Sequence, residues 1–177
     1  MTTLQVLRAA DRVASPWKNG GGVTREVASS PSGAADFDWR VSLADVADGG
    51  PFSVFEGIDR VITVVVGEGM ALTVDGVETV VAERYRPFAF SGDATTGCRL
   101  LGGPLVDFNV MTRRGAVSAE VRFVRDGTAL SGTTLAIVFE GTATLDGTEL
   151  GPLDAALLTD GSAALDVRGL AAVVTFS

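Results

Sequence analysis

The chain of 177 residues contains no histidine, one cysteine (Cys98) and one lysine (Lys18). The lack of histidine excludes Ser-His-Asp and Cys-His nucleophilic catalysis, histidine-ligated zinc, and iron sites built from two histidines and a carboxylate. A single cysteine permits no internal disulfide, and we interpret Cys98 as a small buried thiol without a functional role. The missing residues exclude more mechanisms than any motif in the chain supports.

Positive charge is also scarce. The chain has 14 Lys and Arg residues against 22 Asp and Glu residues, which gives a net charge of -8 and a pI near 4.5. Such a chain repels nucleic-acid phosphates and anionic lipid headgroups, so we expect neither nucleic acid nor membrane as a partner. No apolar run approaches the ~20 residues that cross a bilayer, and the first residues lack the features of a signal peptide. We expect a soluble, cytoplasmic protein.

Helical periodicity is absent, whereas 22 glycines and 6 prolines separate short runs rich in Val, Thr, Leu and Phe. This pattern predicts an all-β protein, and the short spacing of its strands favours a sandwich or barrel. The length is that of a single domain that can bury a substantial core without disulfides.

An internal repeat divides the chain into two related parts. Val64–Gly69 leads to the turn at Asp75, and Ile137–Gly141 leads to a second Asp-Gly turn at Asp146, 71 residues later. Two similar β units follow from this repeat, although Asp-Gly hairpins also recur by chance in β proteins. The segment 115–177 has no Lys, Asn, Gln, Trp, Tyr, Met or Cys, which indicates a packing role.

The rare polar and aromatic residues gather in the first part of the chain. Every Lys, Asn and Trp lies in PWKNGGGVTREV (16–27), DWRVSLA (38–44) or DFNVMTRR (107–114). The three consecutive glycines of the first segment lack the spacing of a nucleotide loop, but they allow a close approach to the backbone. A further segment, GPFSVFEGIDRV (50–61), supplies Ser53 and Arg60, while Phe52 and Phe55 are interpreted as packing residues.

Strand alternation places several of these polar groups on common faces. Residues two apart share a face, so Asp107 and Asn109 lie together, as do Arg40 and Ser42. Polar groups on an otherwise buried strand need partners or a ligand. The clustered cations and amides favour a small anionic ligand held by charge-assisted hydrogen bonds, with solvated surface ion pairs as the alternative.

A family resemblance adds to these inferences. PWKNGGGVTREV, DWRVSLADV, GPFSVFEGIDRV, PFAFSGD and DFNVMTRR, in this order and spacing, resemble the HutD/Ves family over about residues 4–114. The resemblance implies a cupin-type (RmlC-like, jelly-roll) β-barrel fold with two cupin-like halves in one chain, a bicupin. We therefore expect one compact structure, with an N-terminal segment and a site-bearing barrel in 1–114 and a polar-poor half in 115–177.

The resemblance also implies an association with bacterial histidine utilisation (histidine catabolism), where members are regulators or sensors rather than established enzymes. The implied ligands are urocanate, formiminoglutamate or formylglutamate. The family's polar positions, carried onto this chain as ligand-binding residues, are Lys18, Asn19, Glu26, Arg40, Ser42, Ser53, Arg60, Asp107, Asn109 and Arg113. Many cupins hold a metal through histidines and a glutamate, and this chain has no histidine. We therefore expect no cofactor and no metal, unless carboxylates and water bind Mg²⁺ or Mn²⁺ weakly.

Two functional hypotheses from different classes are consistent with these residues. The favoured hypothesis is a binding protein whose liganded state tunes histidine catabolism. The alternative is a metal-free enzyme acting on the same metabolites, with Lys18 or Glu26 as proton carrier or Asp107 as general base. No nucleophile motif supports the enzyme, so we lean against catalysis, and the oligomeric state, a homodimer included, stays open. A pure packing module would not explain why the rare polar residues avoid the second half.

Overall fold

The computed structural model describes every residue from Met1 to Ser177 and confirms the all-β prediction, with 17 strands, one short 3-10 turn and no α-helix. No helix long and apolar enough to span a bilayer is present. Contacts divide the chain into a C-terminal unit, Met1–Arg12 with Ser118–Ser177, and a central unit, Val13–Val117. The two are described separately below.

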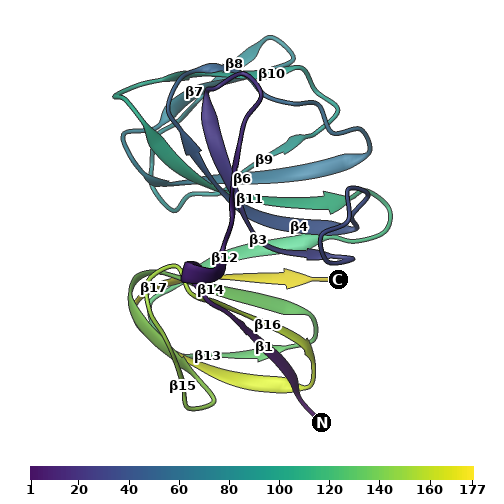
Figure 1. Cartoon of the computed structure of the whole chain (residues 1–177), viewed down its shortest axis with the longest axis vertical. Helices are drawn as coiled ribbons and strands as arrows, with labels where there is room; N and C mark the ends of the chain where they lie inside the picture. Colours follow the sequence, from purple (N-terminus) through teal and green to yellow (C-terminus); the bar gives the residue numbers. More distant parts are fainter. The chain divides into compact units, whose positions relative to one another are not determined.

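The first twelve residues belong with the end of the chain. The sequence analysis assigned them to the first half, but β1 (Thr3–Leu7) pairs antiparallel with β16 (Ala155–Asp160), as Figure 1 shows. Leu4 and Val6 then pack against the hydrophobic core of the C-terminal unit. This long-range pairing carries no local signal in the sequence.

The C-terminal unit is one seven-stranded sheet in the order β1-β16-β14-β17-β12, with β13 paired to β17 and β15 to β14. Its inner side chains, such as Leu145, Leu158 and Val173, are almost fully buried, which agrees with the expected packing role. The remaining elements are η1 (Ala9–Asp11), β12 (Ala119–Val124), β13 (Thr128–Ser131), β14 (Thr134–Leu145), β15 (Thr148–Leu150) and β17 (Ser162–Phe176).

The central unit contains a six-stranded sheet, β2-β3-β4-β11-β6-β9, and a four-stranded sheet, β5-β10-β7-β8. Ile62 and Val64 from the larger sheet and Met70 and Leu72 from the smaller one form its apolar core, against which Cys98 packs half-buried. The strands are β2 (Ala14–Pro16), β3 (Gly22–Ser30), β4 (Trp39–Val46), β5 (Gly50–Pro51), β6 (Ile58–Val66), β7 (Met70–Val74), β8 (Val77–Val81), β9 (Phe88–Ser91), β10 (Thr96–Leu100) and β11 (Leu105–Arg113). The three sheets of the molecule have open edges, whereas the sequence predicted closed barrels.

The two Asp-Gly turns of the sequence repeat have the same local structure. Asp75 and Asp146 both have φ of 46°, and each turn joins a hairpin, β7–β8 or β14–β15. The Asp75 carboxylate accepts the Thr95 N–H at 2.9 Å, and the Asp146 carboxylate accepts the Ala164 N–H at 3.0 Å. The left-handed backbone is favoured by Asp because its short side chain forms such local bonds.

Replacing Asp75 by alanine removes a hydrogen bond and leaves an alanine at positive φ. We expect Asp75→Ala to lower the free energy of unfolding by about 1–2 kcal/mol. Urea unfolding followed by tryptophan fluorescence measures this, because both tryptophans, Trp17 and Trp39, lie in the central unit. Asp48 also precedes a glycine but is exposed and has no positive φ, so Asp48→Ala is the control. Equal losses in the two variants would contradict the role of the turn.

Candidate ligand-binding site

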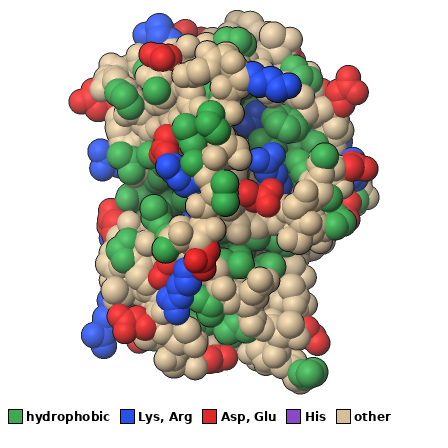
Figure 2. All heavy atoms as spheres, viewed as in Figure 1, with side chains coloured by type: hydrophobic (Ala, Val, Ile, Leu, Met, Phe, Trp, Pro, Cys, Tyr) green, Lys and Arg blue, Asp and Glu red, His purple; other side chains and the backbone are tan.

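A cavity of about 590 Å³ opens in the central unit on the inner face of its six-stranded sheet. Strands β3, β4, β6 and β11 supply the floor, and the segments 15–19 and 51–55 supply the walls. In Figure 2, basic side chains are set among hydrophobic ones in a hollow of this unit. The lining residues are Ser15, Pro16, Trp17, Lys18, Asn19, Thr24, Arg40, Ser42, Ala44, Pro51, Phe52, Ser53, Phe55, Arg60, Asp107, Asn109 and Met111.

Strand register brings the polar floor residues together. Asn109 on β11 lies opposite Ser42 on β4, and the next inward-facing residue, Met111, lies opposite both Arg40 and Arg60. Because cross-strand neighbours have Cβ atoms about 5 Å apart, the inward side chains of three strands form one continuous surface. The predicted alternation of Arg40 and Ser42, and of Asp107 and Asn109, is confirmed.

Arg60 is the most unusual group in the cavity, since its side chain is only 7% exposed. Its guanidinium carbon lies 5.7, 5.3 and 5.0 Å from the ring centroids of Phe52, Phe55 and Phe90. Its Nη2 donates to Asn109 Oδ1 at 3.0 Å, and its Nε has no partner. Loss of hydration lowers the pKa of Arg60 to about 10, against the opposing field of Asp107.

Asp107 is the buried acid of the site, with 1% of its surface exposed. The Asn109 amide donates to Asp107 Oδ1, and no other hydrogen bond reaches this carboxyl group. Burial raises the pKa of Asp107 to about 7, although Arg60 and the Asn109 hydrogen bond oppose the shift. A carboxyl group in this state exchanges its proton near neutral pH.

Two further cations border the cavity at different depths. Arg40 is partly exposed, and its Nε lies 3.2 Å from Glu26 Oε1 in an ion pair. Lys18 is exposed and forms neither an ion pair nor a hydrogen bond with the protein. The cavity therefore has a buried cation at its floor and a freely hydrated one near its surface.

Aromatic residues that the sequence analysis interpreted as packing form part of the site. Phe52 and Phe55 line the cavity, and Phe52 meets Trp17 edge-to-face at 6.4 Å. Trp17 Nε1 donates to Thr24 Oγ1 at 2.8 Å. A Cβ at Gly22 would lie 2.6 Å from the Asp45 carbonyl oxygen and 3.0 Å from the Trp17 ring, so this glycine allows both the backbone of β4 and the Trp17 ring to approach closely.

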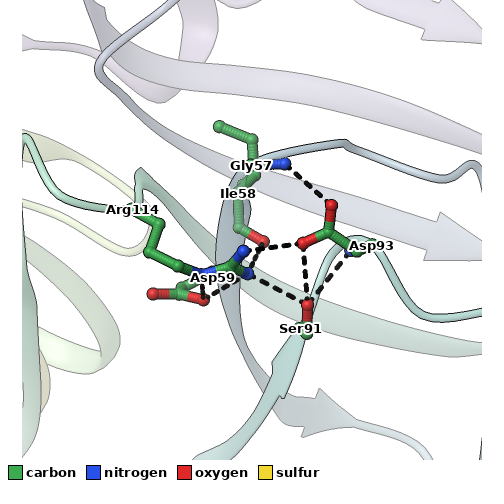
Figure 3. A network of polar contacts seen from close by, with 6 residues as sticks. All are labelled: Gly57, Ile58, Asp59, Ser91, Asp93 and Arg114. Atoms are coloured by element: carbon green, nitrogen blue, oxygen red, sulfur yellow. Dashed lines mark hydrogen bonds and ion pairs between the residues drawn. The ribbon is translucent and has the colours of Figure 1, made fainter.

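A second polar network holds the loop that carries Phe55 (Figure 3). Arg114 donates to Asp59 at 2.8 Å and to Asp93 at 2.8 Å, while Asp93 accepts the Gly57 N–H at 3.0 Å. The Gly57 N–H bond and the Arg114 and Ser91 side chains lower the pKa of Asp93 to about 2. The network fixes the start of β6, three residues after Phe55, whose ring lies over Arg60.

Eight of the ten predicted site residues line the cavity: Lys18, Asn19, Arg40, Ser42, Ser53, Arg60, Asp107 and Asn109. Glu26 does not line it but holds Arg40. Arg113 also lies outside the lining, because it pairs with Asp36 and Asp38 and donates to the Phe37 carbonyl. The predicted site residues did not include four residues that line the cavity: Trp17, Thr24, Phe52 and Phe55. The only signal for three of them was proximity in sequence, because Trp17 adjoins Lys18 while Phe52 and Phe55 lie within two residues of Ser53.

The lining does not fit the metal sites common in cupins. Asp107 is its only carboxylate, and it offers no imidazole or thiolate. No group of three or more His, Cys, Asp or Glu side chains in the structure is arranged to hold a metal ion.

The HutD family model, described as HutD, matches residues 9–175. The chain belongs to the HutD family. It is 44% identical to an uncharacterized 21.2 kDa protein in the hutC 3′ region of Pseudomonas putida over 130 residues, 73% of this chain and 68% of that one. It is also 39% identical to Protein Ves of Citrobacter koseri over 70% of this chain and 65% of that protein, just under two thirds of its length.

Solved structures agree with this family assignment. HutD from Pseudomonas fluorescens SBW25 superposes with a TM-score of 0.89 at 35% identity, covering 99% of this chain and 98% of the other. A cupin 2 conserved barrel protein from Leptotrichia buccalis has a TM-score of 0.60 at 10% identity, covering 93% and 92%. The HutD chain therefore has a cupin-like fold.

The raised pKa of Asp107 makes the stability of the central unit pH-dependent. Between about pH 4 and pH 7 the folded state binds a proton that the unfolded state has released, so the free energy of unfolding falls as pH rises through this window. Asp107→Asn removes this dependence. We expect the variant to equal the wild type near pH 4 and to be more stable near pH 8, by a difference on the order of 1–4 kcal/mol.

Urea unfolding at a series of pH values, followed by tryptophan fluorescence, measures this difference. Asp48→Asn, at an exposed aspartate of the same unit, is the control and should show no such trend. A constant difference across the window, or one that grows on acidification, would contradict the assignment.

Proposed function

We propose that this HutD-family protein binds a small carboxylate metabolite in the central unit and that its liganded state regulates histidine utilisation. The observation that carries the proposal is Arg60, a buried cation that lines the cavity without an ion-pairing carboxylate. Removing a guanidinium from water is costly unless it gains a counter-charge and hydrogen bonds. A ligand carboxylate that accepts from Arg60 would supply both.

The size and lining of the cavity support a small ligand. A volume of about 590 Å³ falls within the roughly 300–1,000 Å³ of small-molecule pockets, and apolar walls with a few directed polar groups are typical of them. Ser42, Asn19 and Ser53 add hydroxyl and amide groups beside the cations. Urocanate, formiminoglutamate and formylglutamate are the candidate ligands, and the relative in the hutC 3′ region supports the link to this pathway.

The proposal includes the wider setting of the protein. We place it in the cytoplasm, without nucleic acid or membrane as a partner, since its net charge is -8. The two units are cupin-like halves of one bicupin, and their matching Asp-Gly turns support this relation. No metal or cofactor is required by the ligand contacts that we propose.

A metal-free enzyme acting on the same metabolites is the second candidate, and Asp107 is the observation that favours it. A buried carboxyl group with a pKa near 7 in a cavity has the properties of a general base. The other candidates suit this role less, because Glu26 is paired with Arg40 outside the lining and Lys18 is exposed.

If Arg60 binds the ligand carboxylate, its loss should weaken binding sharply. A charge-assisted contact contributes ~1.5–3 kcal/mol, so Arg60→Met should raise the Kd of a bound pathway acid by roughly 10- to 150-fold. Calorimetric titration measures the affinity, and the melting temperature of each unliganded variant tests folding.

Arg168→Met is the matched control for Arg60→Met, because Arg168 is an exposed arginine of the C-terminal unit. Its Kd should be unchanged. Retained affinity in a folded Arg60→Met variant, or equal loss in both variants, would contradict the proposed site.

The sensor and enzyme hypotheses differ in whether the protein changes the bound acid chemically. A binding protein should leave urocanate, formiminoglutamate and formylglutamate unchanged after hours at high protein concentration, as chromatography of the mixture would show. Steady conversion that is lost in Asp107→Asn would favour the enzyme instead.

A further inference from the structure

A basic and an acidic side chain lie buried in the cavity without forming an ion pair. Arg60 is 7% exposed and Asp107 is 1% exposed, and both line the same cavity. Asn109 lies between them, accepting from Arg60 at 3.0 Å and donating to Asp107 Oδ1. Direct pairing would offset part of the desolvation cost of both charges, so the intervening amide maintains a separation that protein stability alone does not favour.

Each charged group keeps unused hydrogen-bonding capacity. Arg60 has five N–H groups, of which one donates to Asn109, and its Nε has no partner. The Asp107 carboxylate accepts one hydrogen bond, from Asn109, and its second oxygen accepts none. The cavity therefore presents a donor pole and a separate acceptor pole on one face of the sheet.

A ligand whose only polar groups are carboxylates offers no hydrogen-bond donor to the acceptor pole at Asp107. When Asp107 is ionised, a second negative group beside it would be repelled, whereas an N–H group could donate to the vacant oxygen. From this geometry we infer that the ligand is a carboxylic acid that also carries an N–H donor, with Arg60 binding its carboxylate and Asp107 accepting from its N–H. The inference rests on the proposed function and makes Asp107 a specificity-determining residue of the same site.

Pairs of acids that differ in the N–H group test this on the wild-type chain. The first pair is urocanate and trans-3-(furan-3-yl)acrylate, a similarly shaped acid without N–H. The second is N-formylglutamate and N-formyl-N-methylglutamate. In the pair that binds, we expect the N–H acid to have a Kd roughly 10- to 150-fold lower, by calorimetric titration at pH 8, which is above the pKa of Asp107 of about 7.

The Asp107→Asn variant distinguishes recognition of the ligand N–H by Asp107 from a structural role of this residue. In Asp107→Asn the N–H acid should lose most of its advantage, while the Kd of its N–H-free partner should change little or fall. If Asp107 only balanced the charge of Arg60, both acids would change by the same factor, and that result would overturn the inference.

The two proposals fail in different ways. Equal wild-type affinities within a pair that binds would overturn the N–H inference and leave the carboxylate site intact. Binding by none of the four acids would overturn the proposed function and this inference together.

Discussion

The central unit depends on one constraint, the removal of the Arg60 guanidinium from water. Three phenylalanine rings surround the charge, from the loop before β6 and from β9, and cation–π contacts of this kind strengthen when the site is desolvated. The network of Arg114, Asp59 and Asp93 fixes the chain next to Phe55. The aromatic wall, the strand register and the loop network are thus arranged around a single buried cation.

Asn109 determines the electrostatic character of the site. Its amide accepts from a cation and donates to an acid, so it stabilises both charged groups while keeping them from pairing directly. The resulting donor and acceptor poles lie on two neighbouring strands, with Arg60 on β6 and with Asp107 and Asn109 on β11. The HutD chain presents a buried arginine, an aspartate and an asparagine on this face of the sheet.

Much of the site was predictable because strand alternation is a local rule. The pairing of Arg40 with Ser42 on one face of β4, and of Asp107 with Asn109 on one face of β11, follows from a period of two residues. The concentration of Lys, Asn and Trp in 16–114 indicated where the cavity would lie. Arg113 lies outside the cavity lining because it stands at the end of β11, where it pairs with Asp36 and Asp38 of a loop that alternation does not describe.

The sequence by itself determined the all-β class, the two Asp-Gly hairpins and the faces on which the polar residues lie, since each depends on neighbours within a few positions. Only the tertiary structure decided that β1 joins β16, that Phe52, Phe55 and Phe90 enclose Arg60, and that Asn109 separates Arg60 from Asp107. These features depend on strand register and loop paths between residues as far apart as Thr3 and Asp160. Burial, which sets the charge state of Asp107, arises only when those distant segments pack together.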